Sequence, residues 1–332
     1  MSSLPMNFDL PEIKDKVFSG QALSFEEALG VLSCPDEALA ALYEVVGALR
    51  RKYRGRTVAI QVITSVKNGD CGEDCHYCAQ SLTATTDLDK YSLLAEEALL
   101  RKARLGDQNK ITRHCLGFSG LRFSDAEIET FCRQIALVRQ ESSTPICCSI
   151  GFLTRSQALR LKAAGVSRIN HNLNTSARFY SSICSTHSFE ERLENLRLFK
   201  SVGLEICCGG IVGMGEEPTD VVDMLLTLRD LEPASVPINF YVPISGTSLA
   251  SRNPPQLSPK YCLKVLALAR MILPQAEIRC AAGRERYLAD QTDYVLAAAD
   301  SIFANGYLTV DGLGLEPALA EIAKAGYTVV WG

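Results

Sequence analysis

Apolar positions along the chain follow two different periods. Within residues 1–55, the apolar side chains of 25–32 and 38–49 recur every three or four positions, which predicts helices that end in a basic stretch at 50–56. After this stretch, short β-rich segments alternate with helical ones. The pattern predicts eight strands, at Val58–Val66, Lys110–Gly117, Pro145–Phe152, Arg168–Leu173, Glu205–Val212, Ser235–Val242, Glu277–Ala282 and Asp300–Phe303.

Several segments between the predicted strands carry helix start signals. Ser124 and Glu127 fit a capping box ahead of an apolar face, and Ser188 with Glu191 repeats that pattern. Ser258 is a further N-cap candidate because a proline follows it. These signals predict helices that alternate with the strands along most of the chain.

About eight repeats of strand and helix predict a parallel α/β fold, most simply a (β/α)8 TIM-type barrel. We place the barrel at residues 56–332 and a helical N-terminal extension at residues 1–55. An open doubly wound sheet is the structural alternative. No G-x-G-x-x-G segment follows the first predicted strand, which disfavours the dinucleotide-binding form of that sheet.

The composition excludes some function classes without selecting one. With 332 residues, 47% hydrophobic and 22% charged, the chain is neither disordered nor fibrous. A net charge of −4 and the lack of a Lys/Arg-rich run argue against nucleic-acid or anionic-membrane binding. Residues 1–10 lack the features of a signal peptide, and no apolar run has membrane-spanning length. We therefore expect a cytoplasmic protein.

The unusual number is 13 cysteines, and three of them lie in one short segment. Cys71, Cys75 and Cys78 directly follow the first predicted strand, so they belong on a loop where α/β barrels keep their active sites. Zinc and a [4Fe–4S] cluster both usually take four protein ligands, so three cysteines on a cluster would leave one iron open. A redox pair or three unrelated thiols are the alternatives.

This C-x3-C-x2-C spacing resembles the radical S-adenosylmethionine enzymes, in which such cysteines hold a [4Fe–4S] cluster whose open iron binds S-adenosylmethionine. Within that superfamily, the segment 71–81 is most similar to C-P-E-D-C-K-Y-C-P-Q-S of the biotin synthase family. The resemblance covers roughly residues 20 to 315, and it continues at Asn170–Ser176, Gly209–Glu216, Ser235–Asn239, Ala282–Glu285, Ser301–Phe303 and Tyr307–Thr309.

The resemblance implies sulfur insertion into dethiobiotin to form biotin. It implies that a cluster reduced by flavodoxin or ferredoxin cleaves S-adenosylmethionine to a 5′-deoxyadenosyl radical, which takes hydrogen from the substrate. A sulfide of an auxiliary iron–sulfur cluster then captures the carbon radical. No side chain is needed as a general acid or base, and the family suggests a homodimer.

The resemblance also implies ligands for the auxiliary cluster, at Cys115, Cys147, Cys207 and Arg279. Each lies on a different predicted strand, and side chains from different strands converge inside a barrel. The size of this cluster, [2Fe–2S] or larger, stays open. Inert packing is the alternative for a buried cysteine, and it is our expectation for Cys34, Cys132, Cys184 and Cys262.

The chain departs from the family pattern at Cys148, Cys208 and Cys280, each of which follows an implied ligand by one residue. Three such cysteines at one offset suggest that they alter the auxiliary cluster, for instance by replacing the arginine ligand or by supporting a larger cluster, which a bulge at these positions would allow. The alternative is that they pack outward against helices as small core residues, because neighbours on a regular strand point to opposite faces.

Asn170, Asn172 and Asn174 alternate along one predicted strand, which predicts that they face one side. By resemblance, Asn172 and Asn174 contact the ribose of S-adenosylmethionine, although the family usually has Asp at 174. Asn170 and Asn239 would hold the ureido ring of the substrate. The remaining implied cofactor contacts are Tyr77 beside the adenine, and Gly209 and Gly210 beside the methionine part.

Other polar residues receive expectations of their own. Lys67 and Arg113 match family positions near the two clusters, where a cation offsets negative charge. We expect His76 and His114 to neighbour the clusters without binding them, and His171 to make a structural hydrogen bond. His187 is expected at the surface.

Two alternatives to the main functional interpretation remain. One is a related radical enzyme with another substrate, of the hydrogenase-maturation or methylornithine-synthase type. The other is a non-catalytic iron–sulfur or zinc protein that stores or senses metal.

Overall fold

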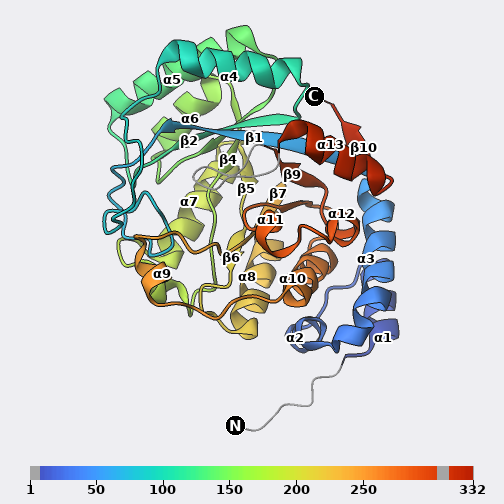
Figure 1. The fold of residues 1–332 in the computed structure, drawn as a ribbon. Coiled ribbons are helices and arrows are strands. Elements are labelled where there is room, and N and C mark those ends of the chain that lie inside the picture. The colour runs from blue at the N-terminus through green and yellow to red at the C-terminus, as the bar shows by residue number, and fades with distance from the viewer. Residues whose placement is uncertain (1–7, 305–313, 332) are drawn as a thin grey trace.

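A closed barrel of parallel strands dominates the computed structural model, which describes residues 8–304 and 314–331 (Figure 1). The strands pair in the order β1-β2-β3-β4-β5-β7-β8-β9, and β9 pairs back to β1. Because β5 and β6 both pair with β7, they form one position of an eight-part barrel. The predicted TIM-type barrel is confirmed. The strands are β1 Thr57–Lys67, β2 Arg113–Phe118, β3 Ile146–Ser149, β4 Val166–Asn170, β5 Glu205–Cys207, β6 Gly210–Val212, β7 Ser235–Phe240, β8 Glu277–Cys280 and β9 Ser301–Phe303.

Several predicted strand boundaries were wrong, and most of the predicted strands were too long; those expected to end at Phe152, Val242 and Ala282 end at Ser149, Phe240 and Cys280. The strand expected at 205–212 is interrupted by Cys208 and Gly209. The strand expected from Lys110 begins at Arg113, because Lys110 has a φ of 51° and lies in a turn. The strand expected to run to Leu173 ends at Asn170. A further strand, β10 Thr328–Val330, pairs with the start of β1 and was not predicted.

Helices surround the barrel, and the sequence signals for their starts are confirmed. Ser124 and Ser188 each close a capping box, at α5 and α7, and Ser258 caps α10. The surrounding helices are α4 Glu96–Gln108, α5 Asp125–Glu141, α6 Arg155–Ala163, α7 Phe189–Ser201, α8 Pro218–Leu231, α10 Pro259–Ile272, α12 Thr292–Ala298 and α13 Leu315–Lys324. Short turns of helix lie between them: η2 Tyr180–Ser182, α9 Ser248–Ser251 and α11 Arg284–Tyr287.

The N-terminal region is helical, as predicted, and lies along one side of the barrel (Figure 1). Its elements are α1 Leu10–Ser19, α2 Phe25–Ser33, η1 Asp36–Ala38 and α3 Leu39–Arg54. Two buried polar contacts attach α3: the Tyr43 hydroxyl donates to Leu263 O at 2.9 Å, and Arg50 Nε donates to Ala299 O at 3.1 Å. The division into domains at residue 55 stays a prediction.

The barrel strands separate two kinds of side chain. Positions that face the helices are apolar and buried, such as Ile60, Leu116 and Ile278. Positions that face the barrel interior are largely polar, and include Gln61 and Glu277, which hydrogen-bond to each other across the barrel at 2.6 Å. The resemblance segment Tyr307–Thr309 lies outside the described residues. No helix among the described residues is long and apolar enough to cross a membrane.

Candidate active site

A cavity of about 270 Å³ opens at the carboxyl ends of the barrel strands. The three cysteines of the loop after β1 line it together with side chains that follow β4 and β7. This is the face where α/β barrels carry active sites. The sequence-predicted residues that line the cavity are Cys71, Cys75, Tyr77, Cys78, Asn170, His171, Asn172, Asn174 and Asn239.

Short-range backbone contacts fold the cysteine loop. The Cys78 N–H donates to Cys75 O at 3.0 Å, and the Cys71 N–H donates to Gln80 O at 3.3 Å. Burial raises the pKa of the Cys71 thiol, and it raises the pKa of Cys78 to about 11. A metal centre reverses that effect, because it binds thiolates and releases their protons.

Tyr77 and Asn174 contact each other beside the cysteine loop. Asn174 Nδ2 donates to the Tyr77 hydroxyl at 2.7 Å. The backbone of Asn174 has a φ of 72°, in the left-handed region that Asn and Asp tolerate better than most residues. Its N–H donates to Gly209 O at 3.1 Å, and its carbonyl accepts from Ile211 N–H at 2.8 Å. Position 174 therefore fixes both the loop after β4 and the tyrosine.

The three predicted asparagines share the cavity, but only Asn170 lies on a strand. Asn170 Nδ2 donates to Asn172 Oδ1 at 3.2 Å and lies 3.3 Å from Cys207 Sγ. Asn172 Oδ1 also accepts from the Gly209 N–H at 3.0 Å. These contacts link the cavity to the barrel interior directly below it.

Asn239, Gly209 and Gly210 contribute mainly to the barrel wall. The Asn239 amide joins neighbouring segments: Nδ2 donates to Gly210 O at 3.0 Å, and Oδ1 accepts from Ala282 N–H at 3.2 Å. A Cβ at Gly209 would lie 1.9 Å from Pro237 O, and one at Gly210 would lie 2.1 Å from Met224 Sδ. Close packing requires a glycine at each position, although neither is among the residues that line the cavity, and their predicted contact with the cofactor stays a prediction.

The cysteines expected at the auxiliary cluster meet inside the barrel. Cys115 on β2 stands opposite Cys147 on β3 in the strand register. Interaction with the Cys115 thiol lowers the pKa of Cys147; burial opposes the shift and Arg168 supports it. Cys207 on β5 lies 3.7 Å from Arg279 Nη1 on β8. The structure thus gathers residues from four strands.

Glu277 anchors this group from below and was not predicted from the sequence. Its Oε1 accepts from Arg279 Nη2 at 2.8 Å and from Ser301 Oγ at 2.6 Å, while Oε2 accepts from Arg168 Nη1 at 3.0 Å. Burial opposes ionisation, yet Arg279 and then Arg168 hold the pKa of Glu277 at about 2. The available signal was an acidic residue two positions before Arg279 on the same predicted strand.

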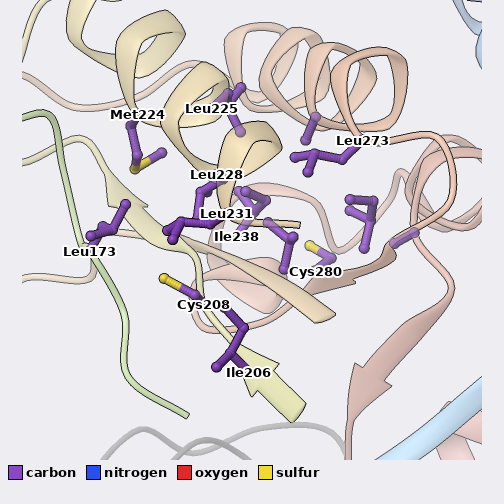
Figure 2. Packing of buried hydrophobic residues seen from close by; sticks show 14 of the residues in the cluster. Leu173, Ile206, Cys208, Met224, Leu225, Leu228, Leu231, Ile238, Leu273 and Cys280 are labelled. Atoms are coloured by element: carbon purple, nitrogen blue, oxygen red, sulfur yellow. The ribbon is translucent and has the colours of Figure 1, made fainter. Parts of the chain in front are cut away.

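The structure directs the neighbouring cysteines away from this group. Cys148, Cys208 and Cys280 are fully buried members of the apolar core between barrel and helices. Figure 2 shows Cys208 and Cys280 among side chains such as Leu228. The pairing of β3 with β4 shifts register between Ile146 and Cys147, and β5 ends just before Cys208. All three side chains nevertheless lie in this apolar core, so their placement favours packing over ligation.

The cationic side chains near the cysteines make protein contacts. Lys67 Nζ donates to Glu127 Oε1 at 3.1 Å, and Arg113 Nη1 donates to Ser167 Oγ at 2.8 Å. Each is close enough to shift the pKa of a cysteine electrostatically, Lys67 for Cys71 and Arg113 for Cys147.

Two expectations for histidines were wrong. His114 points to the helix side and lies 2.9 Å from Thr64 Oγ1, and burial lowers its pKa to about 4. It belongs to the opposite face of β2 from Cys115. His187 is buried at 4% exposure instead of lying at the surface, because it packs under Arg192 against Tyr180.

The other two histidines make backbone contacts. His76 Nδ1 lies 2.9 Å from Ser182 O. His171 Nδ1 lies 3.1 Å from Ile150 O, which fits the structural role expected for it.

Comparisons with known proteins agree with this geometry. The family model of the Radical SAM superfamily matches residues 66–228, and that of the Biotin and Thiamin Synthesis associated domain matches residues 237–328. The chain is 41% identical over 320 residues to a biotin synthase of Kocuria rhizophila, covering 96% of this chain and 68% of that protein. It is 41% identical over 300 residues to a biotin synthase of Geobacillus kaustophilus, covering 90% of each.

Solved structures share the fold at low sequence identity. A methylornithine synthase superposes with a TM-score of 0.82 at 19% identity, covering 96% of this chain and 97% of that chain. The FeFe-hydrogenase maturase HydG from Carboxydothermus hydrogenoformans superposes with a TM-score of 0.84 at 18% identity, covering 97% and 79%. These likenesses show the barrel fold alone.

Proposed function

Because the chain belongs to the biotin synthase family of radical S-adenosylmethionine enzymes, we propose how its own residues divide the work of sulfur insertion into dethiobiotin. That reaction is the one the family carries out, and the radical domain implies a [4Fe–4S] cluster and S-adenosylmethionine. The single observation that carries the residue assignment is the alignment of two cysteine groups, one lining the cavity and one directly beneath it.

The residues present fit both clusters. Cys71, Cys75 and Cys78 offer three buried or half-buried thiols on one loop, which is one fewer than a fully ligated cluster needs. Thiolate sulfur is the donor that iron–sulfur clusters take, so the chemistry of this donor set fits the cluster.

For S-adenosylmethionine, Tyr77, Asn172 and Asn174 are the proposed contacts. Bound to the reduced cluster, S-adenosylmethionine supplies the radical that activates the substrate. The protein residues bind and orient: the Tyr77 ring offers an apolar face, and the two amides offer donors and acceptors for hydroxyl groups. Asn replaces the usual Asp at 174, and its hydrogen bond to Tyr77 preserves the local geometry.

For the auxiliary cluster, Cys115, Cys147, Cys207 and Arg279 are the proposed ligands, and the cluster supplies the sulfur. Glu277 fixes the guanidinium by accepting from Nη2, which directs Nη1 to Cys207. Cys148, Cys208 and Cys280 are proposed as packing residues. The number of irons in this cluster stays open.

For dethiobiotin, Asn170 and Asn239 are proposed to hold the ureido ring. Both amides line the cavity, and Asn170 also touches Cys207, so a ring held there lies between the two cysteine groups. Apolar side chains such as Phe240 and Val242 line the same cavity and exclude water around the reacting carbon.

Some parts of the proposal rest on the family alone. These are flavodoxin or ferredoxin as the electron donor, a homodimer, and a cytoplasmic location. Size measurement in solution tests the dimer, and reduction by each purified donor tests the electron source.

The decisive experiment is anaerobic incubation of the reconstituted protein with dethiobiotin, S-adenosylmethionine and a low-potential reductant. We expect biotin and 5′-deoxyadenosine together. Formation of 5′-deoxyadenosine without biotin would point to a related radical enzyme with another substrate. Zinc in place of iron and sulfide, with no cleavage of S-adenosylmethionine, would overturn the assignment.

A further inference from the structure

Cys184 is a buried cysteine outside both proposed cluster groups, yet it touches one of them. It lies on the loop that follows η2, and its Sγ is 3.7 Å from Cys75 Sγ. Both residues are buried, at 3% and 5% exposure. The sequence suggested only inert packing for Cys184, and this contact gives it a possible chemical partner.

The two loops that carry these cysteines are joined on both sides of the pair. On one side, the Asp74 carboxylate accepts the N–H groups of Ser185 at 2.9 Å and Thr186 at 3.2 Å. On the other side, the His76 N–H donates to Ile183 O at 2.9 Å. The backbones flanking the pair are therefore adjacent. To form a disulfide, the two sulfurs would have to approach from 3.7 Å to about 2 Å.

His187 supports Cys184 from the other side. A guanidinium can only donate, so His187 Nε2 accepts from the Arg192 guanidinium and Nδ1 carries the ring proton. His187 Nδ1 lies 2.9 Å from Cys184 Sγ and donates to it. Cys184 Sγ also lies 3.2 Å from the Asp74 carboxylate, so polar groups of both loops hold this sulfur beside Cys75. The ligand atoms of Cys75, Cys184 and His187 lie within 4.8 Å of one another. The same proton leaves Nδ1 without a free lone pair, so the trio suits thiol chemistry better than metal binding.

We propose that Cys75 and Cys184 form a reversible disulfide when the loop cysteines carry no cluster. Cys75, which lines the open cavity, attacks a small disulfide of the glutathione class and releases one thiol, and Cys184 then attacks Cys75 and releases the second. Two protein thiols are oxidised, one external disulfide is reduced to two thiols, and the protons pass to those thiols. A dithiol reverses the reaction.

The disulfide has a consequence for cluster loading, and that consequence rests on the proposed role of Cys75. While Cys75 is paired with Cys184, it cannot bind iron, and its sulfur is protected from irreversible oxidation. Reduction by a dithiol returns the ligand. The disulfide with Cys184 thus keeps Cys75 in an oxidised form from which a dithiol can restore the free thiol.

Peptide mapping of the full, cluster-free chain tests the pairing. The chain is equilibrated with oxidised glutathione, alkylated and digested with trypsin, which yields 68–90 with all three loop cysteines and 179–192 with Cys184 as its only cysteine. Further cleavage after Asp74 and after Tyr77 separates Cys75 from Cys71 and Cys78. We expect the fragment that contains Cys75 to be linked to 179–192. Alkylated Cys184 after oxidation, or a link from Cys184 to Cys71 or Cys78, would overturn the proposal.

Two variants sharpen the result. Cys184→Ser should lose the linkage, and Cys132→Ser, a matched control at a half-buried cysteine on α5, should keep it. In Cys184→Ser, Cys75 should also show more irreversible oxidation by hydrogen peroxide than in the control. Equal oxidation of Cys75 in both variants would contradict the protective role. Circular dichroism establishes that both variants are folded.

Measuring iron and sulfide uptake tests the effect of the disulfide independently of biotin formation. The oxidised chain should take up less iron and sulfide than the same chain after dithiol treatment, and Cys184→Ser should narrow that difference. If the mapped disulfide forms and iron uptake does not depend on it, the pairing stands and the consequence for loading falls. If the disulfide is absent while the reduced chain makes biotin, the proposed function stands and the pairing falls.

Discussion

Adjacent residues on the same barrel strands have different environments, depending on which face of the strand they occupy. Cys147 points into the barrel, where it stands opposite Cys115 beneath a polar cavity, while Cys148 lies in an apolar core against the helices. Cys207, the last residue of β5, and Cys208 directly after it repeat this difference two strand positions away. The comparison teaches that the chemistry available to a cysteine here depends on the face of the strand, since both members of each pair are buried.

The largest effect on activity is expected when the two cysteines of one pair, Cys207 and Cys208, are replaced separately. Cys207→Ala should abolish biotin formation and remove the auxiliary cluster, because it deletes a proposed ligand. Cys208→Ala should retain both, because it removes only a packing contact. Iron and sulfide per chain, together with biotin formed anaerobically, measure the difference. If Cys208→Ala also lost the auxiliary cluster, the helix-facing cysteines would have to be counted as ligands.

The next effect concerns the acidic anchor of the interior. Glu277→Gln leaves Arg279 and Arg168 buried without their shared carboxylate. Breaking a buried ion pair in this way costs about 3 kcal/mol of unfolding free energy. Glu205→Gln is the matched control, because Glu205 also pairs with Arg168 but is 52% exposed, and its loss should cost less than about 1 kcal/mol. Urea unfolding of both variants measures the costs, and equal costs would contradict the anchoring role.

His114 on the helix-facing side and Glu277 in the barrel interior should lose their contributions to the unfolding free energy over different pH ranges. The lowered pKa of His114, about 4 on the helix-facing side, means that the folded chain resists a proton the unfolded chain accepts from about pH 6.5 downward. Stability from this group is present above pH 6.5 and is lost as the pH falls towards 4. The lowered pKa of Glu277, about 2 in the interior, acts from about pH 4.5 down to 2 in the same sense.

Each group contributes a slope of up to about 1.4 kcal/mol per pH unit in its window. Unfolding free energy measured against pH should therefore lose part of its upper slope in His114→Gln and part of its lower slope in Glu277→Gln. The remaining upper slope comes from His171, whose pKa burial also lowers, and the remaining lower slope from other carboxyl groups with lowered pKa values, such as Asp74. A profile in which His114→Gln alters only the lower window would reverse the assignment of the two groups.

The smallest effect is expected on stability, from substitutions of Cys148, one of the cysteines that pack against the helices. Cys148→Ser buries a hydroxyl among apolar side chains and should cost about 1–2 kcal/mol of unfolding free energy, whereas Cys148→Ala loses packing only. Neither should change iron content. Urea unfolding and iron analysis of the two variants measure this. A serine variant as stable as the wild type would indicate a polar environment at Cys148 and would weaken the comparison.

The barrel could be predicted from the sequence, and so could the position of most candidate site residues at its cavity, while their chemical roles stay predictions. Alternating strand and helix patterns predicted the fold, and capping boxes at Ser124 and Ser188 located two helix starts. The loop cysteines were found by spacing, since Cys71 and Cys78 lie close in sequence and backbone bonds of short range fold the segment. Local signals of this kind do not depend on distant parts of the chain.

Other features required contacts between residues far apart in sequence. Glu277 became an anchor only because strand register places it beside Ser301 and opposite Arg168. From the sequence, His187 was expected at the surface and Cys184 was expected only to fill space. In the structure, both are buried because the loop after η2 packs against the cysteine loop. No periodicity or spacing encodes that meeting.

The sequence by itself determined the element order, the cysteine loop and the family to which the chain belongs. These depend on local hydrogen bonds, apolar periods and motif spacing, which are properties of short segments. The tertiary structure decided which buried cysteines share the barrel interior, which pack against helices, and that Cys184 meets Cys75. The physical reason is that closing the barrel fixes strand register and side-chain direction together, and both are set by the whole chain.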